Sequence, residues 1–191
     1  MKPFHVSKGC AFWFFGLPGS GKTTVSAAFK AYLEARGVPV VLFDGDITRE
    51  IVGEGIGRSE QDRILLTRRY ARLTSYLTES RVIVLLAAIN HTEAQRAYAR
   101  GHHPKDQFGL VWIKAPLEVC RSRDPKGLYR KAKKIIEGGG APNVVGVDIE
   151  FEEPADKDIV IATDEMSPED ACAALLDHLV KTGALVQATG N

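Results

Sequence analysis

The chain has 191 residues, enough for one compact domain with a sizeable core and too few for a second large domain. Lys and Arg total 25 and Asp and Glu total 24, so the formal net charge is +1, and 45% of the residues are hydrophobic. This balance argues against a disordered chain and against a basic nucleic-acid-binding arm, so we expect no nucleic-acid partner.

The apolar stretches also limit the cellular context. The longest, residues 10–15 and 82–89, are far shorter than the roughly 20 residues that a membrane span needs, so no membrane partner is expected. The start of the chain lacks the apolar segment of a signal peptide, which favours a cytoplasmic location. Cys10, Cys120 and Cys172 are widely spaced and odd in number, which predicts free thiols.

Short apolar runs alternate with stretches of helical periodicity along the chain. We assign strands to residues 10–15, 38–43, 81–88, 108–115 and 158–163. We assign helices to residues 22–36, 60–79, 92–100, 117–135 and 168–182. This alternation predicts an α/β fold, a three-layer sandwich around a five-stranded, mainly parallel sheet. Because none of the five runs alternates with polar residues, we expect all five strands to be buried on both faces.

Two helix starts carry clear capping signals. Ser59 is followed three residues later by Asp62, and Ser167 precedes Pro168 at the first helical position. After the last helix, residues 184–191 are predicted to form a frayed tail. We therefore expect a single domain over residues 1–191.

A glycine-rich loop follows the first predicted strand. Residues 16–23, GLPGSGKT, match the pattern G-x-x-x-x-G-K-[ST] in its strand–loop–helix setting, which is typical of P-loop proteins. In such a loop, backbone N–H groups surround phosphate oxygens, Lys22 reaches the β and γ phosphates, and Thr23 offers its hydroxyl to Mg²⁺. The sequence therefore predicts binding of ATP with Mg²⁺. The ATP-binding residues expected in this region are Gly16, Gly19, Ser20, Gly21, Lys22, Thr23 and Thr24.

The second predicted strand runs into acidic residues. The stretch VVLFDGDITR places Asp44 and Asp46 two residues apart, with Arg49 one helical turn later. This pattern suits one carboxylate that holds magnesium waters, another that orients an attacking hydroxyl, and a guanidinium that binds an anionic substrate. A simpler interpretation is also open, in which Asp46 is the N-cap of a short helix and Arg49 is a solvated surface charge.

These motifs, taken together, resemble the adenylylsulfate kinase family. The resemblance extends from about Phe12 to Thr163 and rests on GLPGSGKTT, on DGD with an Arg three residues later, on SEQDR, and on APLEVCRSRDPKGLYRKA at residues 115–132. It implies a P-loop kinase that transfers the γ-phosphoryl group of ATP to the ribose 3′-hydroxyl of adenylyl sulfate, a small-molecule nucleotide. A homodimer is left open.

The resemblance also implies roles by position. Asp46 would orient or deprotonate the hydroxyl, Asp44 would lie near magnesium as a metal residue together with Thr23, and Lys22 completes the catalytic set. Arg49 and Arg63 would bind the charged 5′ group. The further residues implied are Arg121 and Arg123 for ATP, and Asn90, Lys126, Leu128 and Val144 for the acceptor.

Residues 115–132 resemble the start of the family's lid, which we place at about residues 121–148. A closing segment rich in Arg and Lys can cover the phosphates and exclude water, and the glycines at 138–140 favour mobility. On its own, KGLYRKAKK would be interpreted as a solvated basic helix. The basic residues expected in the lid are Arg121, Arg123, Lys126 and Arg130.

The acceptor half departs from the family pattern. Arg58 and Val144 stand where the family usually has two Phe residues that resemble an adenine clamp, and Leu65 and Leu66 replace a Glu-Asn pair. Residues 89–93 replace the family's I-S-P-(F/Y)-R loop. Because stacking on a base contributes roughly 1 to 3 kcal/mol, these changes disfavour adenine.

Three functions remain open at the level of sequence. The first is a kinase for adenylyl sulfate with an altered base pocket. The second is the same reaction on another 5′-modified nucleotide, such as cytidine diphosphoramidate in surface-polysaccharide biosynthesis. The third is a P-loop nucleotide-binding module without phosphotransfer. Retention of Asp46, Arg49 and the lid motif argues against the third, because a binding module needs no acceptor site.

Overall fold

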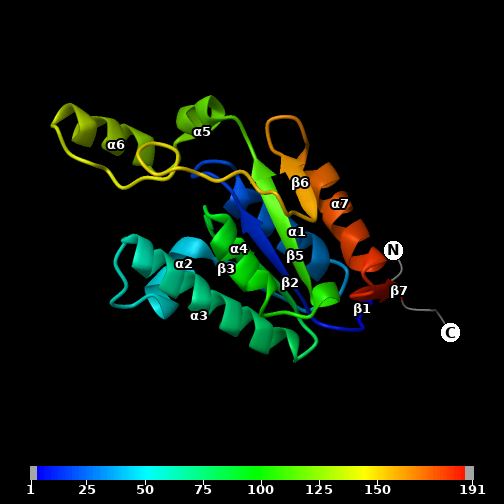
Figure 1. The fold of residues 1–191 in the computed structure, drawn as a ribbon. Coiled ribbons are helices and arrows are strands. Elements are labelled where there is room, and N and C mark those ends of the chain that lie inside the picture. Colours follow the sequence, from blue (N-terminus) through cyan, green and yellow to red (C-terminus); the bar gives the residue numbers. More distant parts are fainter. Residues whose placement is uncertain (1–3, 188–191) are drawn as a thin grey trace.

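The computed structural model describes residues 4–187, which form an α/β sandwich (Figure 1). Five parallel strands make the central sheet, in the order β3–β4–β2–β5–β6. Their bounds are β2 (Cys10–Phe15), β3 (Val40–Asp44), β4 (Ile83–Ala87), β5 (Phe108–Lys114) and β6 (Ile159–Ala162). The predicted five-stranded sheet is therefore confirmed.

Helices cover both faces of the sheet and complete the three layers (Figure 1). Phe12 and Phe14 point to the face covered by α1 (Lys22–Glu34) and α7 (Pro168–Lys181). Trp13 and Phe15 point to the opposite face, which is covered by α3 (Glu60–Thr78) and α4 (Glu93–Arg100). This alternation along one strand makes two separate apolar cores.

The strands differ in burial, in contrast to the expectation that all five are buried on both faces. β2 and β4 are fully buried, as predicted. The prediction was wrong for β3, which is only half-buried, and for β6, where Val160 is 40% exposed. Both are edge strands, and an edge strand has a neighbour on one side only, so the covering helices protect it less completely.

The capping signals at two helix starts are confirmed. The Ser59 hydroxyl accepts a hydrogen bond from the Asp62 backbone N–H at 3.2 Å, and the Asp62 carboxylate accepts one from the Ser59 N–H at 3.0 Å. The Ser167 hydroxyl accepts from the Asp170 N–H at 3.1 Å. These reciprocal bonds satisfy N–H groups that a helix start otherwise leaves unpaired.

One predicted helix is divided in two. Instead of a single helix over residues 117–135, α5 (Leu117–Arg123) and α6 (Leu128–Glu137) are separated by a short turn. Asp124 turns the chain with a positive φ of 22°, and its carboxylate accepts hydrogen bonds from the N–H groups of Tyr129 (3.1 Å) and Arg130 (3.0 Å). The Asp124 carboxylate therefore binds N–H groups at the start of α6, and Asp124 does not extend α5.

Three small elements are absent from the assigned strands and helices, although a short helix near Asp46 was an open alternative. α2 (Gly45–Val52) follows β3 directly. β1 (Phe4–Val6) pairs in antiparallel fashion with β7 (Leu185–Gln187). The frayed tail predicted for residues 184–191 is therefore wrong for its first part, because Ala184 and Leu185 are fully buried in the core shared with α1 and α7. Residues 188–191 lie outside the described residues.

The remaining features concern the lid and the surface. The segment that carries α6 extends away from the sheet (Figure 1), and the 3₁₀ helix η1 (Lys105–Gln107) precedes β5.

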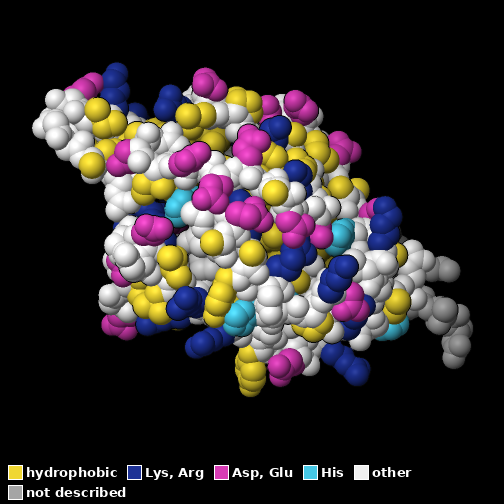
Figure 2. Space-filling model, in the orientation of Figure 1, with side chains coloured by type: hydrophobic (Ala, Val, Ile, Leu, Met, Phe, Trp, Pro, Cys, Tyr) yellow, Lys and Arg dark blue, Asp and Glu magenta, His cyan; other side chains and the backbone are white. Residues whose placement is uncertain are grey.

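Within residues 4–187, no helix is long and apolar enough to cross a membrane. Cys10, Cys120 and Cys172 are free and buried, as predicted. Acidic and basic side chains are interspersed over the face drawn in Figure 2.

Candidate active site

A cavity of about 890 Å³ opens where β2, β3 and β4 end at their carboxyl edge. It is lined by residues of the glycine-rich loop, of the β3–α2 junction, of the stretch after β4 and of the turn between α5 and α6. In a parallel sheet, ligands bind beyond the carboxyl ends of the strands, so this cavity is the candidate active site.

The glycine-rich loop forms one side of the cavity. A Cβ atom at Gly19 (φ +75°) would lie 2.7 Å from the Cys120 carbonyl oxygen, and one at Gly16 would lie 2.3 Å from that of Ile113. Only glycine fits these positions. The loop leads directly into the start of α1. Helix N-termini carry unpaired N–H groups and a positive dipole end, which attract phosphate.

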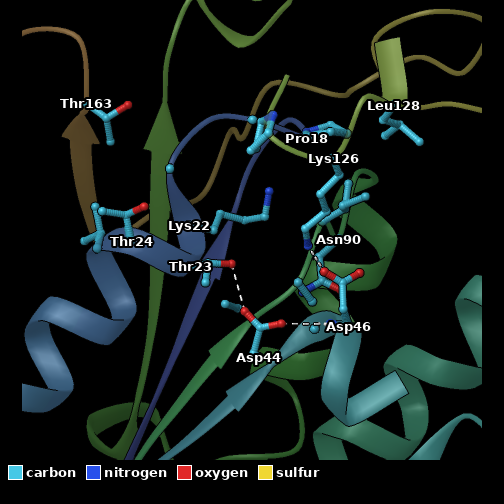
Figure 3. A pocket seen from close by; sticks show the side chains of 18 of the residues that line it. Pro18, Lys22, Thr23, Thr24, Asp44, Asp46, Asn90, Lys126, Leu128 and Thr163 are labelled. Carbon is cyan, nitrogen blue, oxygen red and sulfur yellow. Dashed lines mark hydrogen bonds and ion pairs between the residues drawn. The ribbon is translucent and has the colours of Figure 1, made fainter. Parts of the chain in front are cut away.

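Lys22 is the central cation of the loop. Its ammonium group donates hydrogen bonds to the carbonyl oxygens of Leu17 (2.7 Å) and Gly16 (3.0 Å), so it is held inside the loop (Figure 3). Burial lowers the pKa of Lys22 to about 8, and the nearby Asp44 carboxylate opposes this shift. A desolvated cation in this position favours an anionic ligand.

Asp44 connects the loop to α2 (Figure 3). The Thr23 hydroxyl donates to Asp44 Oδ2 at 2.8 Å, and the Asp46 N–H donates to Asp44 Oδ1 at 3.1 Å. Asp44 is thus the N-cap of α2, and the alternative in which Asp46 caps the helix is wrong. The adjacent hydroxyl and carboxylate oxygens of Thr23 and Asp44 are hard donors of the kind that Mg²⁺ prefers.

The Asp46 carboxylate is not needed to cap α2, and Asp46 lines the cavity. It forms an ion pair with the Lys126 ammonium group, which comes from the turn between α5 and α6 (Figure 3). Both side chains are about two thirds exposed, at 64% and 65%. The Asp46 carboxylate therefore contacts the segment predicted to form a lid.

Three arginines that lie near one another also line the cavity: Arg49, Arg58 and Arg63. Arg49 donates to the carbonyl oxygens of Ile56 (3.3 Å) and Gly57, which argues against a freely solvated surface charge. Burial lowers the pKa of Arg63, and the like charges of Arg49 and Arg58 lower it further. Mutually repelling cations on one wall favour an anionic ligand there.

Arg63 also meets the stretch that follows α6. Its guanidinium donates to the backbone oxygen (3.1 Å) and the side-chain oxygen (3.0 Å) of Asn143, and to the Arg58 carbonyl oxygen at 3.2 Å. These contacts join two segments that are 80 positions apart in the sequence.

The structure brings most of the predicted site residues together. Those that line the cavity are Gly19, Gly21, Lys22, Thr23, Thr24, Asp44, Asp46, Arg49, Arg63, Asn90, Arg123, Lys126 and Leu128. The predicted residues outside its lining are Gly16, Ser20, Arg121 and Val144. Gly16 and Ser20 belong to the glycine-rich loop but lie outside the lining. Arg121 is exposed on α5, and Val144 is buried, with its N–H bonded to Asp148 at 2.6 Å.

Several lining residues were missed by the sequence reasoning. Thr163 follows β6, donates to the Ser20 carbonyl oxygen at 2.7 Å and accepts from Arg123 at 2.9 Å. Its place at the carboxyl end of a predicted strand was a usable signal. His91 carried the same signal, because it follows the predicted strand at residues 81–88. The others offered no such signal and include Thr67, Tyr70, Gln95 and Lys131.

A fully buried arginine supports the stretch after β4. Arg96 donates to the carbonyl oxygens of Asn90 (2.9 Å) and Glu152 (2.8 Å), and it pairs with Glu93 at 2.8 Å. Its guanidinium carbon lies 5.0 Å from the ring centroid of Phe15. Arg96 therefore positions Asn90 without lining the cavity itself.

Comparison with known proteins adds to this geometry. Residues 8–162 match the model of the family described as adenylylsulphate kinase. The adenylyl-sulfate kinase of Vibrio parahaemolyticus is 38% identical over 172 residues, covering 90% of this chain and 82% of that protein. The adenylyl-sulfate kinase of a Synechococcus species is 38% identical over 176 residues, covering 92% and 97%. The solved Mycobacterium tuberculosis APS kinase, in complex with AMPPNP and APS, superposes with a TM-score of 0.83 at 31% identity, covering 91% and 98%.

Proposed function

The chain belongs to the adenylylsulphate kinase family, whose members are phosphotransferases with an alcohol acceptor, and we propose that it transfers the γ-phosphoryl group of ATP to the ribose 3′-hydroxyl of a 5′-modified nucleotide. The observation that carries this proposal is the shared cavity. It joins the phosphate loop, the Asp46 carboxylate and an arginine wall.

The donor half fits ATP with Mg²⁺. The loop glycines and the start of α1 would hold the β and γ phosphates, with Lys22 as their cation. Thr23 and Asp44 would hold the metal, directly or through its waters, and their oxygens already lie 2.8 Å apart. When bound, the metal would neutralise charge on the phosphate oxygens.

The acceptor half supplies orientation. In place of its ion pair with Lys126, the Asp46 carboxylate accepts a hydrogen bond from the ribose hydroxyl and favours loss of its proton, while the arginine wall holds the anionic 5′ group. Lys126 and Arg123 come from the segment that we propose as the lid, about residues 121–148. Closure of that segment excludes water from the reacting phosphate.

Adenylyl sulfate is the family substrate, and a second acceptor class is favoured by one specific observation. Arg58 lines the cavity where the family usually has an aromatic residue, and Val144 is buried outside the lining. Two stacking surfaces of roughly 1 to 3 kcal/mol each are missing. The same reaction on a non-adenine nucleotide, such as cytidine diphosphoramidate, is therefore the alternative.

A panel assay distinguishes these functions. ADP release is measured with adenylyl sulfate and with 5′-modified cytidine, uridine and guanosine nucleotides, and NMR identifies the phosphorylated hydroxyl. We expect turnover of at least one acceptor, with the phosphate on the 3′ position, and a Thr23→Ala variant that loses most of it. ADP release at the background rate of ATP hydrolysis with every acceptor would contradict the proposal and favour a binding module. A cytoplasmic location and a homodimer remain predictions.

A further inference from the structure

The acceptor half of the cavity contains an unpaired buried amide. Asn90 follows β4 with a positive φ of 41° and is 6% exposed. Its side-chain oxygen faces the Thr67 hydroxyl at 3.4 Å, and the same hydroxyl lies 3.0 Å from the Arg63 carbonyl oxygen. The Asn90 Nδ2 atom has no hydrogen-bond partner among the described residues. A buried donor without a partner is costly, and a ligand atom would satisfy it.

Gln95 provides a second amide whose side-chain oxygen faces a donor of the protein. It is 5% exposed, and its side-chain oxygen accepts from the Thr92 N–H at 3.3 Å within the capping box of α4. The structure shows no partner for its Nε2 atom within residues 4–187. The oxygens of both amides thus face groups of the protein, both residues line the cavity, and neither NH₂ group has a hydrogen-bond partner among the described residues.

His91 lies in the same wall, and the wall carries no formal charge at neutral pH. Burial lowers the pKa of His91, and the Arg63 and Arg96 guanidinium groups lower it further, while Glu152 and Glu60 oppose them. His91 and Gln95 also line a smaller cavity of about 410 Å³ that adjoins this wall between α3 and α4. Asn90, His91 and Gln95 therefore form a neutral wall beside the three arginines.

We propose that the amide groups of Asn90 and Gln95 donate hydrogen bonds to a ring carbonyl oxygen of the acceptor's base, and thereby select oxo bases over adenine. This inference rests on the proposed function. In the proposed function, the arginines bind the anionic 5′ group and Asp46 binds the ribose hydroxyl. The base is the remaining neutral portion of the acceptor, and the neutral wall is the remaining surface that can bind it. Cytosine, uracil and guanine present such an oxygen, whereas the adenine amino group would place a donor against donors.

Two isosteric substitutions replace the free donors with carboxylate oxygens, and each also adds one negative charge to the wall. Asn90→Asp keeps the oxygen that faces Thr67, and Asp tolerates a positive φ. Gln95→Glu keeps the capping box, because Glu also accepts from Thr92 at that position. Gln61→Glu, on the exposed first turn of α3, is the matched control. Asn90→Gly retains the backbone conformation and removes the side chain.

The measurement compares two acceptors that differ in one substituent of the base. Adenosine and inosine nucleotides with the same 5′ group differ by an amino or an oxo group, and kcat/KM for each is determined beside KM for ATP. We expect the parent to prefer the inosine acceptor about tenfold or more. Asn90→Asp, Gln95→Glu and Asn90→Gly should lose most of this preference with KM for ATP unchanged, and Gln61→Glu should retain it.

The other outcomes overturn the inference. Turnover by the parent without preference for the oxo base, or an equal loss on both bases in the variants, excludes a base carbonyl as the partner while leaving the proposed function intact. Full kcat/KM in Asn90→Gly reduces Asn90 to a backbone role. Absence of turnover of every nucleotide by the folded parent removes the proposed function and this inference together.

Discussion

The Lys126 ammonium group forms an ion pair with the Asp46 carboxylate, although 80 positions separate the two residues in the sequence. Exposed pairs of this kind contribute only about 0.2 to 1 kcal/mol, so an acceptor hydroxyl can displace the lysine at little cost. The contact links α2 to the proposed lid across the cavity. It also indicates where the reacting hydroxyl would lie.

Replacement of Asp46 by Asn should lower kcat by roughly 10²- to 10⁴-fold, because the amide cannot accept the proton of the hydroxyl. KM for ATP should change little, since Asp46 does not belong to the phosphate loop. Single-turnover phosphoryl transfer in the folded variant is the measurement. Glu50→Gln on the same helix is the control and should behave like the parent. Transfer at the parental rate in Asp46→Asn would remove Asp46 from the chemistry.

The lowered pKa of Lys22 predicts a pH dependence of ATP binding. Phosphate needs the protonated amine, so affinity for MgATP should fall as pH rises through about 8, and binding above that pH should take up a proton. For the stability of the protein without ATP, the effect of raising the pH has the opposite sign. The native state loses this proton at about 8 and the unfolded chain at about 10.5, so the Lys22 contribution to stability rises with pH between these values.

Calorimetry in buffers of different ionisation enthalpy tests this expectation. Lys22→Arg is the informative variant, because a guanidinium stays charged over the whole range and should abolish both the pH dependence and the proton uptake. Lys30→Ala on the exposed side of α1 controls for loss of a lysine. An affinity in the parent that stays constant through this pH range would show that the Lys22 proton is not linked to ATP binding.

Arg123 and Arg121 should differ, although both were expected to bind ATP. Arg123 lines the cavity and donates to the hydroxyl (2.9 Å) and carbonyl (2.9 Å) oxygens of Thr163, whereas Arg121 is exposed outside the lining. We expect Arg123→Ala to raise KM for ATP about tenfold, as for the loss of a charge-assisted hydrogen bond. Arg121→Ala should be close to the parent in the same steady-state assay. Equal effects of the two substitutions would contradict this distinction.

Arg96 is expected to be important for stability. Its removal leaves the Asn90 and Glu152 carbonyl oxygens without their buried donor and Glu93 without its partner, so Arg96→Ala should lower the free energy of unfolding by about 3 to 5 kcal/mol. Urea denaturation measures the change. Arg72→Ala, an exposed arginine on α3, should stay within about 0.5 kcal/mol of the parent. A similarly small change in Arg96→Ala would mean that water replaces its hydrogen bonds.

Local signals were predicted well from the sequence. Ser59 and Asp62 form a capping box because the two residues lie three positions apart. Thr23 meets Asp44 because β2 and β3, the strands on either side of β4, end at the same edge of the parallel sheet. Asp124 shows where such reasoning fails. An aspartate inside a helical pattern gives no sign that its side chain will turn back to the N–H groups of Tyr129 and Arg130 and divide the helix.

The sequence by itself therefore determined the alternation of strands and helices, the phosphate loop and the acidic end of β3, because each depends on periodicity or on residues close in the chain. Only the tertiary structure decided that Asp44 rather than Asp46 caps α2, that Leu185 joins the core through β7, and that Val144 lies outside the cavity. It also decided the neutral wall at Asn90 and Gln95. These features depend on burial and on hydrogen-bond partners contributed by distant segments, and no local pattern records which distant groups will compete for a given side chain.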